Sequence, residues 1–229
     1  MKTLAIIPAR GGSKRIPRKN IQPFMGKPII EYSIQAAIAS GLFDEVMVST
    51  DDEEIIEIAR KAGAQVPFVR SSKTANDHAH LGEVIQEVLE MYAQQGKIFD
   101  TICCILATAP FITADRIKQA YTVLDKGNYD SVIPVLRFSF PIQRAFKVDN
   151  ETLSMFQPEH LLTRSQDLEP AFHDSGQFYW MRTEAFQKNK VILTKNTGYI
   201  ELSEMEVQDI DTVEDWEIAE FKYSLGNKK

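Results

Sequence analysis

Short apolar runs rich in β-branched residues alternate with longer segments of helical period over the first 136 residues. Several of these runs are apolar at nearly every position, which is typical of strands in a sheet that is covered on both faces. The predicted strands lie at residues 3–7, 45–49, 66–69, 101–106 and 131–136, and a later one at 178–181.

Between the strands, apolar residues recur at spacings of three and four, the period of an amphipathic helix. Asp51, Thr113 and Thr212 each precede such a pattern and are predicted to cap a helix. Strand–helix alternation of this kind predicts right-handed βαβ units, a mostly parallel sheet, and ligand sites at the carboxyl ends of its strands. The helical patterns cover residues 30–38, 55–59, 81–92, 117–124 and 213–225.

The regular alternation stops after Leu136. Residues 137–175 mix aromatic residues, prolines and arginines without a clear period. We interpret this stretch as an arm or small subdomain inserted into a single domain that spans residues 1–229.

The charge of the chain is unevenly distributed. Its 229 residues contain 26 Lys and Arg against 32 Asp and Glu, a net charge of −6 that argues against a nucleic-acid-binding protein as a whole. Residues 1–30 nevertheless hold seven basic and no acidic side chains, so the remaining 199 residues carry 19 minus 32, or −13. The basic segment therefore raises the question of which anion it binds.

Cysteine usage and hydropathy favour a cytoplasmic protein without a membrane partner. Cys103 and Cys104 are adjacent in a predicted strand, where neighbours point to opposite faces, so we expect two buried thiols in a reducing compartment. No apolar run approaches the roughly 18 residues of a membrane span. The apolar N-terminal stretch contains Pro8 and stops at Arg10, unlike a signal peptide.

A basic, glycine-containing loop, residues 8–20, leaves the carboxyl end of the first predicted strand. Two glycines allow backbone amides to turn toward an anion, a serine adds a donor, and flanking cations supply charge for a polyphosphate. The spacing of neither a Walker loop nor a GxGxxG loop is present. We predict phosphate binding, with a solvated basic loop as the alternative. The residues concerned are Arg10, Gly11, Gly12, Ser13 and Lys14.

Asp209 and Asp211 are two residues apart near the C-terminus. In an extended segment this spacing places both carboxylates on one side, an arrangement suited to a hard cation that keeps several waters. The alternative is helix capping, because an amphipathic helix begins directly after Asp211. The two functions are compatible, and together with the loop we predict a metal site.

Residues 7–20 resemble the signature loop of the cytidylyltransferases that activate nine-carbon acidic sugars, the CMP-sialic acid synthetase group. Further strings follow in the order of that family, so the resemblance covers nearly the whole chain. They are Gly26-Lys27-Pro28, Ser49-Thr50-Asp51, Ala107-Thr108-Ala109-Pro110 and Asp209-Ile210-Asp211-Thr212. The resemblance implies a Rossmann-like, three-layer α/β fold of the nucleotide-diphospho-sugar transferase type, with a mostly parallel sheet and an inserted dimerisation arm.

The resemblance also implies a reaction and its residues. CMP would pass from CTP to the anomeric hydroxyl of a nonulosonic acid, with release of pyrophosphate, Mg²⁺ as cofactor and a homodimer as the assembly. Arg10, Lys14 and Asp211 would be catalytic, and Asp209 and Asp211 would bind the metal. Nucleotide binding would fall to Ala9, Arg10, Gly12, Ser13, Lys14, Asn20 and Arg70, and sugar binding to Arg164, Gln143 and Gln166.

The strings Phe140–Phe146, Arg164–Leu168 and His173–Gly176 resemble the subgroup that acts on pseudaminic acid. The family glutamine near the nucleotide is replaced by Leu106, which favours a substrate other than ordinary sialic acid. His173 and Asp174 could line the sugar pocket or shape a turn. The alternatives are legionaminic, N-acetylneuraminic or 3-deoxy-octulosonic acid as acceptor, a non-catalytic nucleotide-binding protein, or RNA binding through the basic segment.

Overall fold

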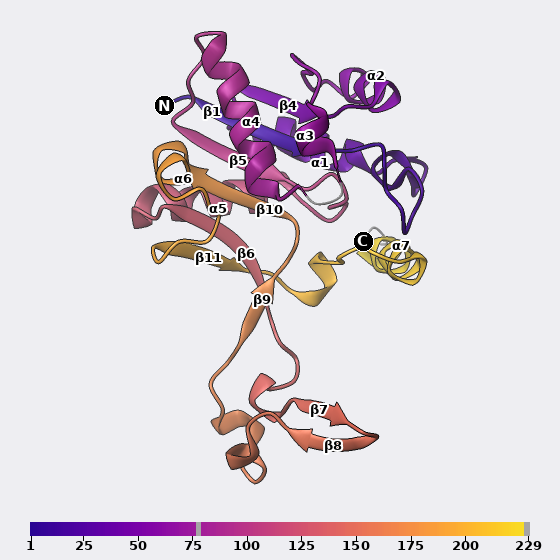
Figure 1. Cartoon of the computed structure of the whole chain (residues 1–229), viewed down its shortest axis with the longest axis vertical. Coiled ribbons are helices and arrows are strands. Elements are labelled where there is room, and N and C mark those ends of the chain that lie inside the picture. Colours follow the sequence, from indigo (N-terminus) through magenta and orange to yellow (C-terminus); the bar gives the residue numbers. More distant parts are fainter. Residues whose placement is uncertain (77–78, 227–229) are drawn as a thin grey trace.

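A computed structural model describes residues 1–76 and 79–226 of the chain. Its centre is a seven-stranded sheet in the order β11-β6-β10-β5-β1-β4, with β9 paired to β6 (Figure 1). β1 is parallel to β4 and β5, and β11 is parallel to β6, whereas β10 runs antiparallel to β5 and β6, and β9 antiparallel to β6. The strands are β1 (Thr3–Pro8), β4 (Glu45–Ser49), β5 (Thr101–Ile105), β6 (Ser131–Arg137), β9 (Phe172–Asp174), β10 (Phe178–Arg182) and β11 (Thr197–Glu201). The predicted mostly parallel sheet is confirmed.

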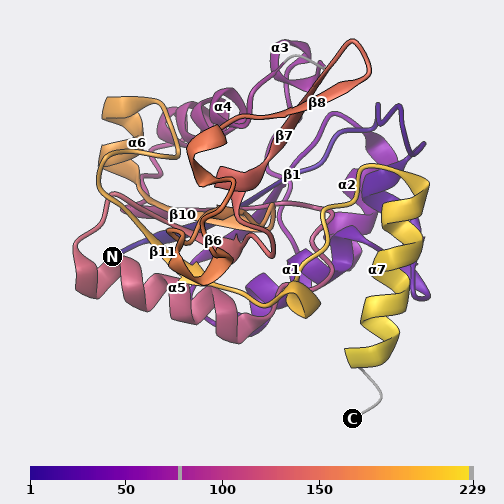
Figure 2. The same cartoon turned by 90° about the horizontal axis from the view of Figure 1, so that it is seen from below.

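Helices cover both faces of this sheet, which makes the fold three-layered (Figure 2). α1 (Ile30–Ser40), α2 (Glu53–Lys61) and α5 (Ala114–Gly127) pack in one hydrophobic core. α4 (Leu81–Gln94) and α6 (Thr183–Asn189) pack in the other. Alternate residues of the central strands β1 and β5 enter alternate cores, so the predicted Rossmann-like architecture is confirmed.

The adjacent cysteines illustrate the alternation. Cys103 lies in the core with α1 and α5, and Cys104 lies in the core with α4. Both are free, fully buried thiols, and burial raises the pKa of each. The expectation that they point to opposite faces is confirmed.

A third core connects the two ends of the chain. Phe24, in the small hairpin of β2 (Pro23–Phe24) and β3 (Lys27–Pro28), packs edge to face on Trp216 of α7 (Val213–Gly226), with ring centroids 5.6 Å apart. Ile16 and Ile210 are buried in the same cluster. This packing brings residues 209–212 beside the loop that follows β1, although almost the whole chain separates them in sequence.

Two sequence predictions about local structure were wrong. Residues 66–69 form no strand: one isolated bridge joins Met47 to Gln65, and Pro67, which has no backbone N–H, cannot extend the ladder. The cap of α2 is Asp52 rather than Asp51, because the Asp52 carboxylate accepts a hydrogen bond from Ile55 N at 3.1 Å.

The segment between β6 and β9 forms an arm that projects from the sheet (Figure 1). It contains the hairpin of β7 (Phe146–Asp149) and β8 (Thr152–Met155) and three short helices, η2 (Ile142–Arg144), η3 (Pro158–His160) and η4 (Ser165–Asp167). Many of its apolar side chains are exposed, among them Phe140 at 82% and Leu162 at 92%. In the described part of the chain, no helix is both long and apolar enough to cross a bilayer.

Candidate active site

A cavity of about 330 Å³ opens beside the carboxyl ends of β1 and β5, where a mostly parallel sheet is expected to bind its ligand. Arg10, Ser13, Asn20 and Arg70, all predicted to bind nucleotide, line it together with Lys19. The remaining lining residues are Pro8, Asn76, Ala79, Leu81, Val84, Leu106, Ala107 and Thr108. The cavity therefore combines a cationic part with an apolar part, as a nucleotide requires.

The loop of residues 9–19, called the phosphate loop below, is fastened at both ends. Ala9 N donates a hydrogen bond to Ser49 O at 2.9 Å, and Asn20 Nδ2 donates to Arg10 O at 2.9 Å. Ala9 is buried and Asn20 is 9% exposed, so both anchor the loop to the interior of the domain. Gly12 is exposed, and a Cβ built on it would have no neighbour within 4 Å. The space beside Gly12 is therefore open, and Lys14 on the same loop is also exposed.

Arg70 presents a second guanidinium to the cavity. It is only 8% exposed, and its guanidinium donates hydrogen bonds to the backbone O and, at 3.4 Å, to the Oγ1 of Thr74. Glu87 of α4 in turn accepts hydrogen bonds from the Thr74 hydroxyl and from Ser71 N. Burial lowers the pKa of Arg70, and repulsion from Arg10 adds to this effect. A polyphosphate placed between these two cations would relieve that repulsion.

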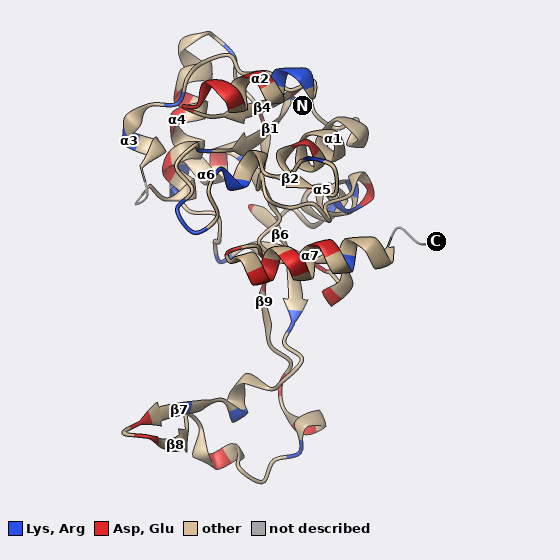
Figure 3. Cartoon of the chain, turned by 90° about the vertical axis from the view of Figure 1, so that its right-hand side faces the viewer, with Lys and Arg blue, Asp and Glu red and all other residues tan. Residues whose placement is uncertain are grey.

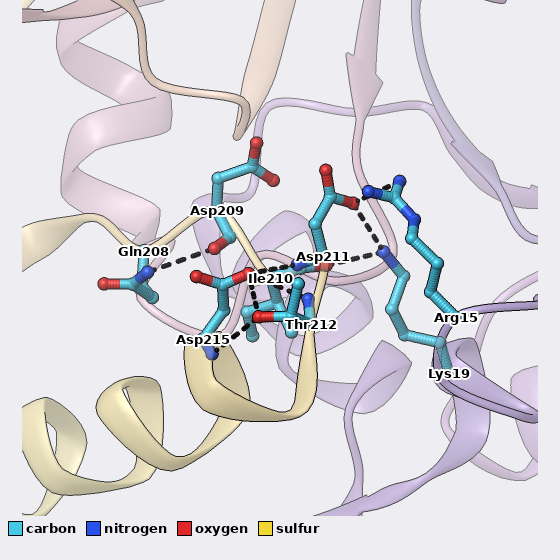
Figure 4. A network of polar contacts seen from close by, with 8 residues as sticks. All are labelled: Arg15, Lys19, Gln208, Asp209, Ile210, Asp211, Thr212 and Asp215. Carbon is cyan, nitrogen blue, oxygen red and sulfur yellow. Dashed lines mark hydrogen bonds and ion pairs between the residues drawn. The ribbon is translucent and has the colours of Figure 1, made fainter. Parts of the chain in front are cut away.

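Asp211 contacts the phosphate loop directly (Figure 4). Its Oδ1 accepts hydrogen bonds from Arg15 Nη2 at 2.8 Å and from Lys19 Nζ at 3.4 Å. Lys19 Nζ also donates to Ile210 O at 2.6 Å. These contacts place Asp211 beside the phosphate loop, as the sequence predicts.

Helix capping at the start of α7 does not need Asp211. Thr212 Oγ1 accepts a hydrogen bond from Asp215 N at 3.2 Å, while Asp215 Oδ2 accepts from Thr212 N at 2.8 Å and from Asp211 N at 3.0 Å. Thr212 and Asp215 therefore cap the helix reciprocally, as predicted for Thr212. The side chain of Asp211 is left to point away from α7, which is itself rich in acidic residues (Figure 3).

The two aspartates fit a magnesium ion. The Asp209 and Asp211 carboxylates point to the same side of their segment (Figure 4). Partial burial raises the pKa of Asp209, and the negative charge of Asp211 raises it further, so a cation at this position would stabilise both ionised forms. Within residues 1–76 and 79–226 no group of three or more metal-ligating side chains is assembled. A two-carboxylate set completed by water and phosphate oxygens is how proteins commonly hold Mg²⁺.

The predicted sugar-binding residues lie on the arm and not at the cavity. Arg164 is exposed and pairs with Asp167, with Nε 2.7 Å from Oδ2. Gln143 Nε2 donates to Glu169 O at 2.9 Å, and its buried Oε1 has no hydrogen-bond partner. Gln166 lines a separate cavity of about 470 Å³ where the arm joins the sheet. A single chain therefore does not bring these three residues to the phosphate loop.

His173 and Asp174 shape a turn. Asp174 Oδ1 accepts a hydrogen bond from Gly176 N at 2.8 Å, and Oδ2 accepts from the Tyr179 hydroxyl at 2.8 Å. A Cβ added to Gly176 would lie 3.8 Å from the Asp209 carboxylate. The turn therefore lies close to the Asp209 carboxylate, although both oxygens of Asp174 are already used within it.

Three cations of the phosphate loop have specific contacts that the sequence did not reveal. The sequence predicts no individual contact for Arg15, Arg18 or Lys19 beyond a general positive field. Instead Arg15 and Lys19 contact Asp211, and Arg18 forms a bidentate pair with Asp52 at the start of α2. Sequence reasoning also missed Thr74 and Glu87 behind Arg70. The position of Asp52 before a helical pattern could have indicated its role as a cap. Side-chain pairs between distant segments, in contrast, leave no recognisable pattern in the local sequence.

The chain is similar in sequence and in fold to known proteins. A family model described as cytidylyltransferase matches residues 4–220. The chain is 45% identical to pseudaminic acid cytidylyltransferase of Campylobacter jejuni subsp. jejuni serotype O:2, over 100% of this chain and 99% of that protein. It is 32% identical to CMP-N,N'-diacetyllegionaminic acid synthase of Legionella pneumophila, with 100% and 99% covered. A solved CMP:2-keto-3-deoxy-manno-octonic acid synthetase complexed with CTP shares the fold, with a TM-score of 0.72 at 18% identity over 99% of this chain and 100% of that chain.

Proposed function

The chain belongs to the cytidylyltransferase family, and we propose that it transfers CMP from CTP to the anomeric hydroxyl of a nonulosonic acid, with pseudaminic acid as the preferred acceptor. The observation that carries this proposal is the cavity at the ends of β1 and β5. It holds two guanidinium groups, Arg10 and Arg70, and the loop that forms it also contacts Asp211.

The residues of the chain act by positioning and by charge. Arg10 and Arg70 would bind the triphosphate, with Ser13 and backbone amides of the phosphate loop as further donors. The oxygen of the anomeric hydroxyl forms a bond to the α-phosphorus as the bond from that phosphorus to the pyrophosphate oxygen breaks, and the proton of the hydroxyl passes to solvent. Negative charge then builds on the leaving pyrophosphate, where these cations stabilise it. The transfer needs no covalent intermediate on the enzyme.

Asp209 and Asp211 would hold Mg²⁺ beside the phosphates. When bound, the ion neutralises phosphate charge and polarises the phosphoryl group. Arg15 and Lys19 both contact Oδ1 of Asp211, so an ion bound through this oxygen would replace those contacts. Because Arg15 is 67% exposed, that exchange costs little.

The first test is release of pyrophosphate from CTP by the purified protein with Mg²⁺ and a panel of acceptors. We expect the highest kcat/KM with pseudaminic acid and lower values with legionaminic, N-acetylneuraminic and 3-deoxy-octulosonic acids. A higher value with any other acid would overturn the substrate assignment alone. Failure of every acceptor would overturn the transferase proposal, and salt-dependent binding of RNA would then support the nucleic-acid alternative.

We also propose that two copies pair through the arm, in the cytoplasm where CTP is available. The exposed apolar residues of the arm, including Phe146, Leu153 and Leu162, form more unpartnered apolar surface than an isolated chain usually tolerates. Arg164 and Gln166 lie on this arm, so pairing offers a route by which they approach a phosphate loop.

Leu162→Glu is expected to convert the dimer to monomer in sedimentation velocity, because it places a charge in the paired surface. Leu162 is 92% exposed in the single chain, so its substitution should not affect folding. Ile98→Glu is the matched control, since Ile98 is 73% exposed but lies before β5, away from the arm. A wild-type protein that sediments as a monomer at every concentration would contradict the proposal.

A further inference from the structure

We propose that Asp52 is a positioning residue for the phosphate loop: its carboxylate pairs with Arg18, packs against Gly11, and thereby holds the loop in the conformation that binds triphosphate. The proposal rests on the function proposed above. Asp52 follows β4 and lies outside the cavity, so its effect reaches the reaction only through the loop.

The Arg18–Asp52 pair has the geometry of a strong contact. Both Nη atoms of Arg18 donate to the two carboxylate oxygens of Asp52, with Nη2 2.9 Å from Oδ1, and Nη2 also contacts Glu54 Oε2 at 2.5 Å. The Asp52 side chain is 19% exposed and the Arg18 side chain 38%. A bidentate, partly buried pair of this kind is more stable and more directional than an exposed ion pair.

The backbone of Arg18 requires such an anchor. Arg18 lies in the left-handed region, with φ 57° and ψ 27°, which residues with a side chain generally disfavour. Its carbonyl oxygen also accepts hydrogen bonds from Ile21 N and Gln22 N, which close the turn after the phosphate loop. The contacts of the Arg18 guanidinium with Asp52 and Glu54 therefore offset the conformational free energy that its left-handed backbone costs.

Asp52 is itself held in place by the fold. Its Oδ1 caps α2 by accepting from Ile55 N at 3.1 Å, and its backbone N donates to Thr50 Oγ1 at 3.2 Å. The hydrogen bonds from Arg18 lower the pKa of Asp52, so the carboxylate stays ionised at neutral pH. The loop is thus attached to a rigid helix terminus rather than to another loop.

Gly11 shows how closely the loop fits this carboxylate. A Cβ built on Gly11 would lie 2.3 Å from Asp52 Oδ2, too close without a displacement, and 3.2 Å from Arg18 Nη1, a tight contact. Gly11 is next to Arg10, whose side chain lines the cavity. The position of the Asp52 carboxylate therefore determines where Arg10 and its neighbours lie.

Asp52→Ser tests the pairing without removing the helix cap, because serine is also a good N-cap residue. We expect the KM for CTP to rise about tenfold with a much smaller change in kcat, and the thermal midpoint to stay near wild type. Arg18→Met should have the same effect. Thr113→Ala is the control, since it removes the cap of α5 far from the loop and should lower the thermal midpoint without changing KM. An unchanged KM in Asp52→Ser would overturn the proposal.

Limited trypsin digestion gives a readout that needs no acceptor sugar. The phosphate loop contains five trypsin sites, Arg10, Lys14, Arg15, Arg18 and Lys19. Cleavage within the loop should be several-fold faster in Asp52→Ser than in wild type. Equal cleavage rates would refute the positioning role, even if the protein proved inactive on every acceptor. A failure of the transferase proposal and a failure of this one are therefore distinguishable.

Gly11→Ala completes a double-mutant cycle. In the wild-type background the added methyl group should displace Asp52 and raise the KM for CTP at least as much as Asp52→Ser does. In the Asp52→Ser background the carboxylate is absent, so the same methyl group should cause little further loss. Additive effects of the two substitutions would show that Gly11 and Asp52 act independently, contrary to the proposal.

Discussion

Asp211→Asn is expected to lower kcat by about 10³-fold while the thermal midpoint stays within a few degrees of wild type. The substitution keeps the size of the side chain but removes the charge that would hold Mg²⁺ and complement the phosphate loop. Stability should survive because Thr212 and Asp215 cap α7 without the Asp211 carboxylate. Its ion pair with the exposed Arg15 contributes about 1 kcal/mol or less.

Glu214→Gln is the matched control for Asp211→Asn. It makes the same change of carboxylate to amide in the first turn of α7, at an exposed position three residues away. We expect steady-state rates of pyrophosphate release close to wild type. If Asp211→Asn retained more than about a tenth of wild-type kcat, Asp211 would have no part in the chemistry.

Arg10→Gln is expected to reduce kcat/KM for CTP by about 10²- to 10³-fold. The side chain lines the cavity beside Arg70, and its removal takes away a cation where charge builds on the leaving pyrophosphate. The loop itself should persist, because Asn20 bonds to the backbone oxygen of residue 10 and not to its side chain. Circular dichroism and the thermal midpoint should therefore stay close to wild type.

Arg60→Gln provides the comparison for Arg10→Gln. Arg60 lies in the last turn of α2, and its guanidinium donates a hydrogen bond to Val66 O at 3.3 Å. We expect its kcat/KM to equal that of wild type within experimental error. Equal losses in the two variants would mean that net charge, not the position of Arg10, controls CTP use.

The secondary structure follows closely from the hydrophobic pattern where that pattern is strong. The strand at 45–49 and the helices that begin at Ile30, Leu81 and Val213 lie where the periodicity places them. The hydrophobic pattern did not predict the secondary structure where contacts between distant segments determine it. Residues 66–69 are as apolar as a strand, but Pro67 prevents pairing, and β11 has few apolar residues yet pairs along β6.

The candidate site could be predicted only as separate segments. The basic loop indicated phosphate binding from its glycines and cations, and the two aspartates indicated a metal from their spacing. The contact that each cation of the loop makes could not be predicted from the sequence. Three arginines lie within nine residues of one another and have identical side chains. Arg15 nevertheless contacts Asp211, Arg18 contacts Asp52, and Arg10 lines the cavity.

The sequence by itself determined the fold class, the family and the types of residue available for binding a nucleotide, since these depend on periodicity and on local strings. Only the tertiary structure decided which residues meet. The basic first 30 residues and the acidic remainder are joined at Asp211 because α7 packs on Phe24 and carries residues 209–212 to the phosphate loop. Such contacts depend on packing between elements far apart in the chain, and no local pattern encodes them.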